Sequence, residues 1–188
     1  MIPPAIVLGL AITHLLSGFG RTVHRLAGHG RAISLDWIHL TWVVHIFLWM
    51  VFFWWYSYNW IGNQEWSFLV FMFLIVYTIL LYLMCVILIP EDLDEVEDFG
   101  AYFMSLRAWF FAGVILLILV DFLDSAAKGW DNVVDLGAGY VSLRTFLLAG
   151  SVAAIVTTNR VYHACFAVVA TTWTFLYFWL NRPSIGLG

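Results

Sequence analysis

The sequence predicts an all-α, polytopic membrane protein with six transmembrane helices, short loops and one or two interfacial amphipathic helices. Hydrophobic residues make up 63% of the 188 residues and charged residues only 11%, whereas soluble domains carry about 25% charged residues. The 11 Trp, 8 Tyr and 16 Phe suit the aromatic belts of a protein that crosses the bilayer several times. We therefore expect one helical domain over residues 1–188, surrounded by lipid.

The expected spans are apolar stretches separated by polar or glycine-rich segments. Residues 2–17 lack the basic start and small-residue cleavage site of a signal peptide, so we expect them to be retained as the first span. Residues 37–58 and 66–89 are uncharged and long enough to cross a bilayer. The other three spans are expected at residues 106–122, 143–158 and 161–180.

Two of the connecting segments have a helical pattern of apolar residues. In residues 18–36, the apolar side chains recur at helical spacing between arginines, so part of this segment is expected to lie on the membrane surface. In residues 90–107, Pro90 followed by Glu91 and Asp92 predicts the start of a second surface helix that leads into the fourth span. The apolar face of that helix would consist of Leu93, Val96, Phe99, Gly100 and Phe103.

The distribution of Lys and Arg predicts the orientation, because basic residues concentrate on the cytoplasmic side. With the N-terminus outside, five arginines face the cytoplasm and three basic residues face outward. We expect a multi-pass protein of the bacterial inner membrane with both termini on the periplasmic side. The inner set is Arg21, Arg25, Arg31, Arg107 and Arg160, and the outer set is Lys128, Arg144 and Arg182.

In this topology all six histidines fall in the inner half of the protein, and His45 lies deepest. Trp42 and Trp49 flank it at i−3 and i+4, on the same helix face. Because an ionisable residue inside a membrane is costly, it suggests an ion path. The leading hypothesis is a non-enzymatic, oligomeric channel or transporter for protons or monovalent cations. His45 would be its relay, His14, His39 and His163 its inner vestibule, and Asp121 and Asp124 its outer mouth.

Other chemistry for these residues stays open. Haem b could be held between His14 and His45. A zinc or copper site could use His14, His45, His163, Cys85 and Cys165. No spacing among them is diagnostic of a ligand set, so we expect no cofactor, with haem b or a pigment as the exception. The simpler interpretation is that His39, His163 and His14 lie near the inner interface and cap backbone groups.

A second class of function is an accessory or scaffold subunit of a larger respiratory or photosynthetic complex. Its aromatic-rich spans would present packing surfaces to partner helices. The sequence contains no GxSxG, HExxH or P-loop motif, which argues against an enzyme of those classes. It also has no basic patch that would bind nucleic acid.

The acidic run at residues 91–98 has two interpretations. Its carboxylates could bind a divalent cation, but a solvated, paired surface is the simpler one. The topology places the run beside the basic segment that follows the first span. We expect surface ion pairs of Arg21, Arg25 and Arg31 with Glu91, Asp92, Asp94 and Glu95.

Overall fold

The computed structural model describes residues 2–29, 31–60, 68–93, 96–127 and 137–181. Within these ranges the chain is all-helical, and each helix is long and apolar enough to cross a membrane, which confirms the predicted fold class. Helices suit a bilayer because they satisfy every backbone group internally. The helices are α1 (Ile2–Leu26), α2 (Trp37–Trp60), α3 (Phe68–Leu88), α4 (Phe99–Ala127), α6 (Gly137–Val156) and α7 (Arg160–Leu180).

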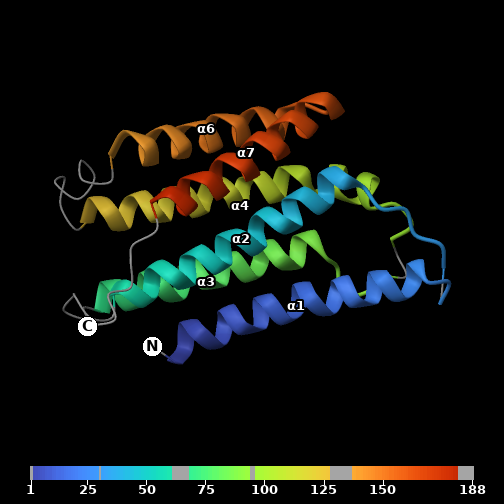
Figure 1. The fold of residues 1–188 in the computed structure, drawn as a ribbon, viewed down its shortest axis with the longest axis horizontal. Helices are drawn as coiled ribbons and strands as arrows, with labels where there is room; N and C mark the ends of the chain where they lie inside the picture. The colour runs from blue at the N-terminus through green and yellow to red at the C-terminus, as the bar shows by residue number, and fades with distance from the viewer. Residues whose placement is uncertain (1, 30, 61–67, 94–95, 128–136, 182–188) are drawn as a thin grey trace.

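Consecutive helices run antiparallel, so the connections alternate between the two ends of the bundle (Figure 1). Helix α2 has the most central place and packs against α1, α3, α4 and α7, while α1 and α6 lie at the two edges. Helices α1, α3 and α6 end where α2, α4 and α7 begin. We call this the arginine-rich end, because Arg21, Arg25, Arg31, Arg107 and Arg160 all lie toward it.

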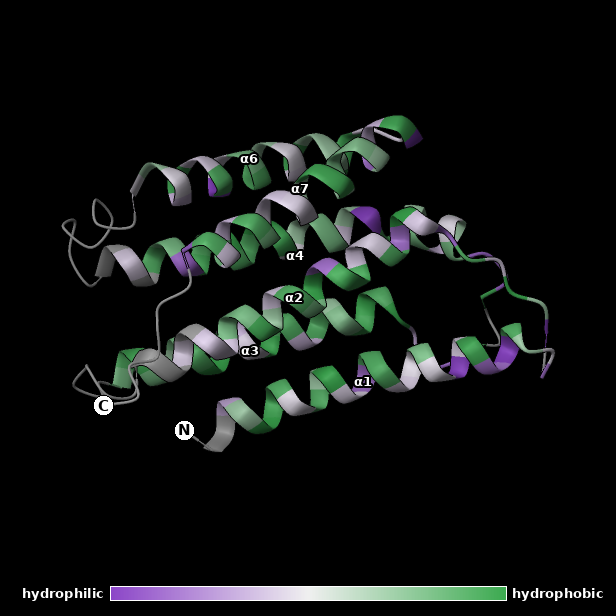
Figure 2. Ribbon diagram, in the orientation of Figure 1, coloured by the Kyte–Doolittle hydropathy of each residue, from purple (hydrophilic) through white to green (hydrophobic). Residues whose placement is uncertain are grey.

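The distribution of hydropathy also distinguishes the arginine-rich end from the rest of the molecule (Figure 2). The helices are apolar along most of their length, and hydrophilic residues gather on the last turns of α1 and in the connections at the arginine-rich end. Large apolar side chains are exposed on every helix, such as Leu16 on α1, Leu83 on α3 and Val152 on α6. This outer surface is suited to a lipid bilayer.

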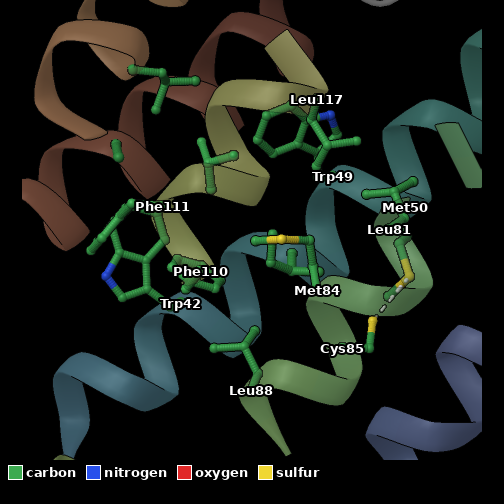
Figure 3. Close-up of a cluster of buried hydrophobic side chains, with 14 of the residues drawn as sticks. Trp42, Trp49, Met50, Leu81, Met84, Cys85, Leu88, Phe110, Phe111 and Leu117 are labelled. Carbon is green, nitrogen blue, oxygen red and sulfur yellow. Dashed lines mark hydrogen bonds between the residues drawn. The ribbon is translucent and has the colours of Figure 1, made fainter. Parts of the chain in front are cut away.

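The core is a continuous cluster of aromatic and aliphatic side chains (Figure 3). Trp42 is fully buried at its centre, and its ring meets those of Phe110, Phe111 and Phe166 edge-on at centroid distances of 5.2–5.3 Å. Such edge-to-face pairs are favourable beyond the area they bury. These contacts join α2, α4 and α7 into one packed unit.

The first span is longer than predicted. Helix α1 continues through Gly18 to Leu26, so the segment expected to lie on the membrane surface forms the last turns of α1. Glycine at position 18 permits a close approach, because a Cβ there would lie 2.3 Å from a side-chain atom of Ile89, just after α3. The hydroxyl of Thr22 donates to the Gly18 carbonyl and supports the same turn.

The helix expected to begin at Pro90 was wrong, because α4 begins only at Phe99. The predicted apolar residues Leu93, Val96 and Phe99 are indeed buried, but in a small satellite cluster under a non-helical connection. Two sets of hydrogen bonds hold the described part of this connection in place. Arg25 donates to the carbonyls of Leu93 and Val96, and Asp98 accepts hydrogen bonds from the first backbone N–H groups of α4.

The two long connections at the arginine-rich end are tied together. Ser34 and Asp98 form an isolated parallel bridge, with Ser34 N donating to Glu97 O at 2.8 Å and Phe99 N donating to Ser34 O at 3.1 Å. Asp36 is buried and its Oδ1 caps α2 by accepting from the N–H groups of residues 38 and 39. Its other oxygen pairs with Arg160 at the start of α7. These contacts link the N-terminal ends of α2, α4 and α7 to one another.

Candidate functional site

The carbonyl groups at the C-terminal end of α3 are capped by side chains from three other helices. The last carbonyls of a helix have no partner within it and need one from elsewhere. The caps are Tyr102 OH on Ile87 O at 3.1 Å, His39 Nε2 on Leu88 O at 2.8 Å, His14 Nε2 on Ile89 O at 2.7 Å and Arg21 on Pro90 O at 3.5 Å. We call these four side chains the α3 cap.

The α3 cap accounts for two of the histidines that were candidates for an inner vestibule. His39 is buried and its ring stacks on Phe99 at 4.7 Å. His14 is half-buried beside Tyr82. A ring nitrogen of each is engaged with a carbonyl, as the simpler interpretation predicts.

His163 has one satisfied and one unsatisfied nitrogen. Its Nε2 donates to Thr157 O at 3.0 Å, which caps the end of α6, and its ring stacks on Phe111. Its Nδ1 is buried and has no hydrogen-bond partner among the described residues. His163 therefore combines a structural contact with an unused polar atom in the core.

His45 is fully buried. Trp42 and Trp49 meet its ring edge-on at 5.1 and 5.6 Å, so the aromatic walls expected from the sequence are present. The hydroxyl of Thr171 on α7 lies 3.3 Å from Nδ1. Nε2 has no partner in the described part of the chain. An unpartnered polar atom in a packed core costs free energy, so this histidine is costly where it lies.

Hydroxyl groups continue from His45 along one face of α7. Thr171, Thr174 and Tyr177 follow one another at intervals of three residues, which places them on the same side of the helix. Thr174 is buried, and its hydroxyl has no partner among the described residues. The ring of Tyr177 lies 6.5 Å from that of Tyr140 on α6. These side chains thus lead from His45 toward the end of the bundle that lies opposite the arginine-rich end.

An ion pair lies where this face reaches α6. Arg144 Nη2 is 2.9 Å from Asp121 Oδ2 on α4, and the two side chains are only 13% and 21% exposed. Tyr140 OH donates to the same carboxylate. The guanidinium also lies over the rings of Trp49 and Tyr140 at 5.1 and 5.0 Å. The carboxylate is therefore compensated by a cation instead of standing free at an outer mouth.

A buried hydrogen bond between α2 and α3 involves Trp49, whose ring lies beneath Arg144. Trp49 Nε1 donates to Tyr77 OH on α3 at 2.9 Å, and both side chains are buried. Trp49 thus contacts His45, Tyr77 and Arg144 in turn. We call the buried or half-buried polar groups that run from the core to this end the interior polar track: His45, Thr171, Thr174, Tyr177, Tyr140, Asp121 and Arg144.

The candidate ligands for haem or a metal have separate surroundings. His14 bonds beyond the end of α3, whereas His45 contacts α7. Cys85 is buried and its thiol donates to Met50 Sδ at 3.8 Å (Figure 3), while Cys165 is exposed. Within the described ranges, no three His, Cys, Asp or Glu side chains are grouped to hold a metal ion.

Two of the three arginines expected to pair with the acidic run bond backbone carbonyls in the described residues. Arg25 is buried and donates to the carbonyls of Leu93, Val96 and Arg31, so it holds the connection by its backbone. Arg21 reaches a carbonyl as part of the α3 cap. Two of the expected partners, Asp94 and Glu95, lie outside the described residues, as does the side chain of Asp124.

Sequence reasoning missed Arg144, Tyr140 and Tyr177, together with Thr171 and Thr174 of α7. Arg144 was assigned to the outer surface because it stands near the start of its span. A usable signal was present, since Asp121 and Arg144 carry opposite charges within consecutive apolar spans, where an ionisable residue usually has a partner. The threonines carry no sequence signal that separates them from ordinary helix residues.

Comparison of the chain with protein-family models, with curated proteins and with solved structures gives no match.

Proposed function

We propose that the protein conducts protons across a membrane. The interior polar track would carry them between the core and the end opposite the arginine-rich end, and His45 would be the relay at its inner limit. The observation that supports this most is a set of buried polar atoms around the track that have no hydrogen-bond partner among the described residues: His45 Nε2, Thr174 Oγ1, His163 Nδ1 and Trp42 Nε1. A membrane protein that needed only stability would bury apolar groups here. Costly intramembrane polar residues are typical of proton relays.

The chemistry of the track suits protons better than metal cations. An imidazole can accept a proton on one nitrogen and release one from the other, and hydroxyl groups both donate and accept. Thr171 contacts His45, and Tyr140 bonds Asp121. Asp121 is neutralised by Arg144, which removes the free negative charge that a metal cation would require. Arg144 and Trp49 are donors only, so their role is to orient the acceptors.

Proton flux into liposomes tests this proposal. The purified protein would be reconstituted with a trapped pH dye and a potassium diffusion potential. His45→Gln keeps a polar side chain but removes the titrating ring, and we expect flux to fall by about 10²-fold, at the low end of the effect of a positioned acid–base group. His24→Gln is the control, because His24 is exposed at the end of α1. Full flux in His45→Gln, or none in the wild type, would refute the proposal.

A pair of threonine variants tests whether protons pass along α7. Thr174→Val removes a hydroxyl that has no partner in the described part of the chain from the proposed path, and we expect flux to fall at least about tenfold. Thr78→Val removes an equally buried hydroxyl that donates to Leu74 O on α3, away from the track. Equal flux in the two variants would show that protons do not pass along α7.

For the setting, we infer a multi-pass protein of a bacterial inner membrane with the arginine-rich end in the cytoplasm, in accordance with the positive-inside rule. Both α1 and α7 have their other ends on the opposite side. Alkaline phosphatase fused after the last residue should then be active, because that enzyme folds only in an oxidising compartment. An inactive fusion that is fully expressed would reverse the orientation.

Trp109 favours a second candidate, a subunit of a larger membrane assembly or a homo-oligomer. Tryptophans of membrane helices concentrate at the two interfaces, but Trp109 lies well inside the span of α4 and is 72% exposed. A partner helix would bury it. Purification in mild detergent, with Trp109→Leu as the variant, tests this: the wild type should elute as an assembly and the variant as a smaller species.

A further inference from the structure

The interior polar track covers only part of the distance between the two ends of the bundle. At its inner limit, His45 lies beside Thr171, near the middle of α7. His163 precedes Thr171 by eight residues, which places it about 12 Å nearer the arginine-rich end at the rise of an α-helix. It lies on the buried face of α7 that also carries Thr174. His163 is therefore in line with the track, on the side where the track ends.

The two ring nitrogens of His163 have different surroundings. Nε2 lies 3.0 Å from the carbonyl oxygen of Thr157, in the connection between α6 and α7. Because a carbonyl only accepts, Nε2 carries the hydrogen and Nδ1 is left as an acceptor. Nδ1 is buried, and no described residue bonds it. Thr158 and Asn159, which follow Thr157, are exposed. The ring thus joins a buried acceptor to a part of the chain that water reaches.

Two aromatic rings separate His163 from His45. Trp42 contacts His45 at a centroid distance of 5.1 Å, and Phe111 contacts His163 at 5.7 Å. Trp42 and Phe111 are themselves 5.2 Å apart and fully buried (Figure 3). An apolar constriction blocks conduction by excluding water. The two rings are therefore a barrier between the two histidines.

Unused polar atoms lie beside this barrier. The indole nitrogen of Trp42 and the hydroxyl of Ser151 on α6 are buried and have no partner within the described ranges. Gly150, next to Ser151, packs closely on Phe166, since a Cβ at Gly150 would lie 2.3 Å from that ring. Phe166 in turn meets Trp42 at 5.3 Å. Water that entered between the rings would find hydrogen-bonding groups at this level.

We propose that His163 is a second proton relay and that Trp42 and Phe111 form a gate between it and His45. This inference rests on the proposed proton conduction. When Phe111 turns aside, water fills the gap and joins the two histidines. A proton from this water binds His163 Nδ1 while Nε2 releases its own proton to water at the exposed connection. One proton enters and one leaves, so the ring stays neutral and returns to its first tautomer.

Replacement of His163 tests the second relay in the liposome assay. His163→Gln keeps a side-chain donor for the Thr157 carbonyl but removes the titrating ring, and flux should fall at least about tenfold. His39→Gln is the matched control, because His39 is buried at the same end and also bonds a carbonyl. Its flux should stay at the wild-type value. The same flux in both variants would overturn the second relay.

Phe111 and its neighbour Phe110 provide a matched pair for the gate. Both are fully buried and contact Trp42 at nearly the same distance, but it is Phe111 that stacks on His163. Phe111→Ala should raise flux at least about tenfold, since a modest fall in a barrier multiplies the rate by that factor. Phe110→Ala leaves a cavity of the same origin and should change flux far less. Phe111→Val gives the same test if the alanine variant does not fold.

A double variant separates an open gate from a damaged protein. Phe111→Ala combined with His45→Gln should conduct no more than His45→Gln alone, because the added flux must still pass His45. Added flux in the double variant, or an equal rise in Phe110→Ala, would overturn the gate. Unchanged flux in Phe111→Ala would also overturn it, while a His45-dependent flux in the wild type would leave the proposed function standing. No flux in either protein would refute both.

Discussion

Two regions of this molecule that bury polar side chains differ in what those side chains bind. At the end of α3, His14, His39 and Tyr102 each bond a backbone carbonyl. In the interior polar track, His45 and Thr174 have polar atoms without a partner in the described chain. The first arrangement satisfies a helix end. The second leaves polar atoms without partners among the described residues, at a cost in stability, which is why we propose a function for the track.

The largest effect should come from breaking the ion pair of the track. Arg144→Met leaves the largely buried carboxylate of Asp121 without its cation. We therefore expect a loss of about 3 kcal/mol in the free energy of unfolding. Arg144→Met combined with Asp121→Leu removes both charges and should cost less than about 1 kcal/mol. Unfolding in mixed micelles with increasing denaturing detergent measures both.

The double variant decides what the ion pair is for. If the pair itself contributes to stability, the double variant should lose clearly more than about 1 kcal/mol relative to the wild type. If it serves the track, the double variant should be nearly as stable as the wild type and yet conduct no protons.

The difference between the two regions also explains what could be predicted from the sequence. Six spans follow from apolar composition, because lipid imposes one chemical requirement over a whole helix. The depth of His45 between Trp42 and Trp49 follows from helical periodicity. The partner of His45 does not, because it depends on the side of α2 that α7 covers, and apolar helices of this kind have no sequence pattern that fixes their rotation.

The connection after α3 shows a second limit. The spacing of Leu93, Val96 and Phe99 predicts a buried face correctly but a helix wrongly. Its backbone carbonyls are bound by Arg25, which lies in α1, far away in the sequence. A tertiary contact with a distant arginine thus overrides the local pattern, and no property of residues 90–98 alone signals it.

An intermediate effect is expected at Asp36, the buried carboxylate of the arginine-rich end. Asp36→Ala removes both the cap of α2 and the pair with Arg160, and we expect a loss of about 2 kcal/mol. Asp36→Asn keeps a capping oxygen and loses only the charge. Because Arg160 is 63% exposed, that variant should lose less than about 1 kcal/mol. Similar losses in the two variants would mean that the ion pair, and not the cap, holds this end.

The smallest effects give the sharpest contrast, because they replace two buried histidines by the same residue. His39→Phe preserves the stack on Phe99 but leaves the Leu88 carbonyl without its donor, and we expect a loss of about 1–2 kcal/mol. His45→Phe removes a ring whose Nε2 has no partner among the described residues and whose Nδ1 has only a 3.3 Å contact with Thr171. The new ring retains the contacts with Trp42 and Trp49. The unfolding free energy of this variant should therefore change by less than about 0.5 kcal/mol or rise. A larger loss at His45 than at His39 would mean that His45 is a structural residue, and the comparison between the two regions would fail.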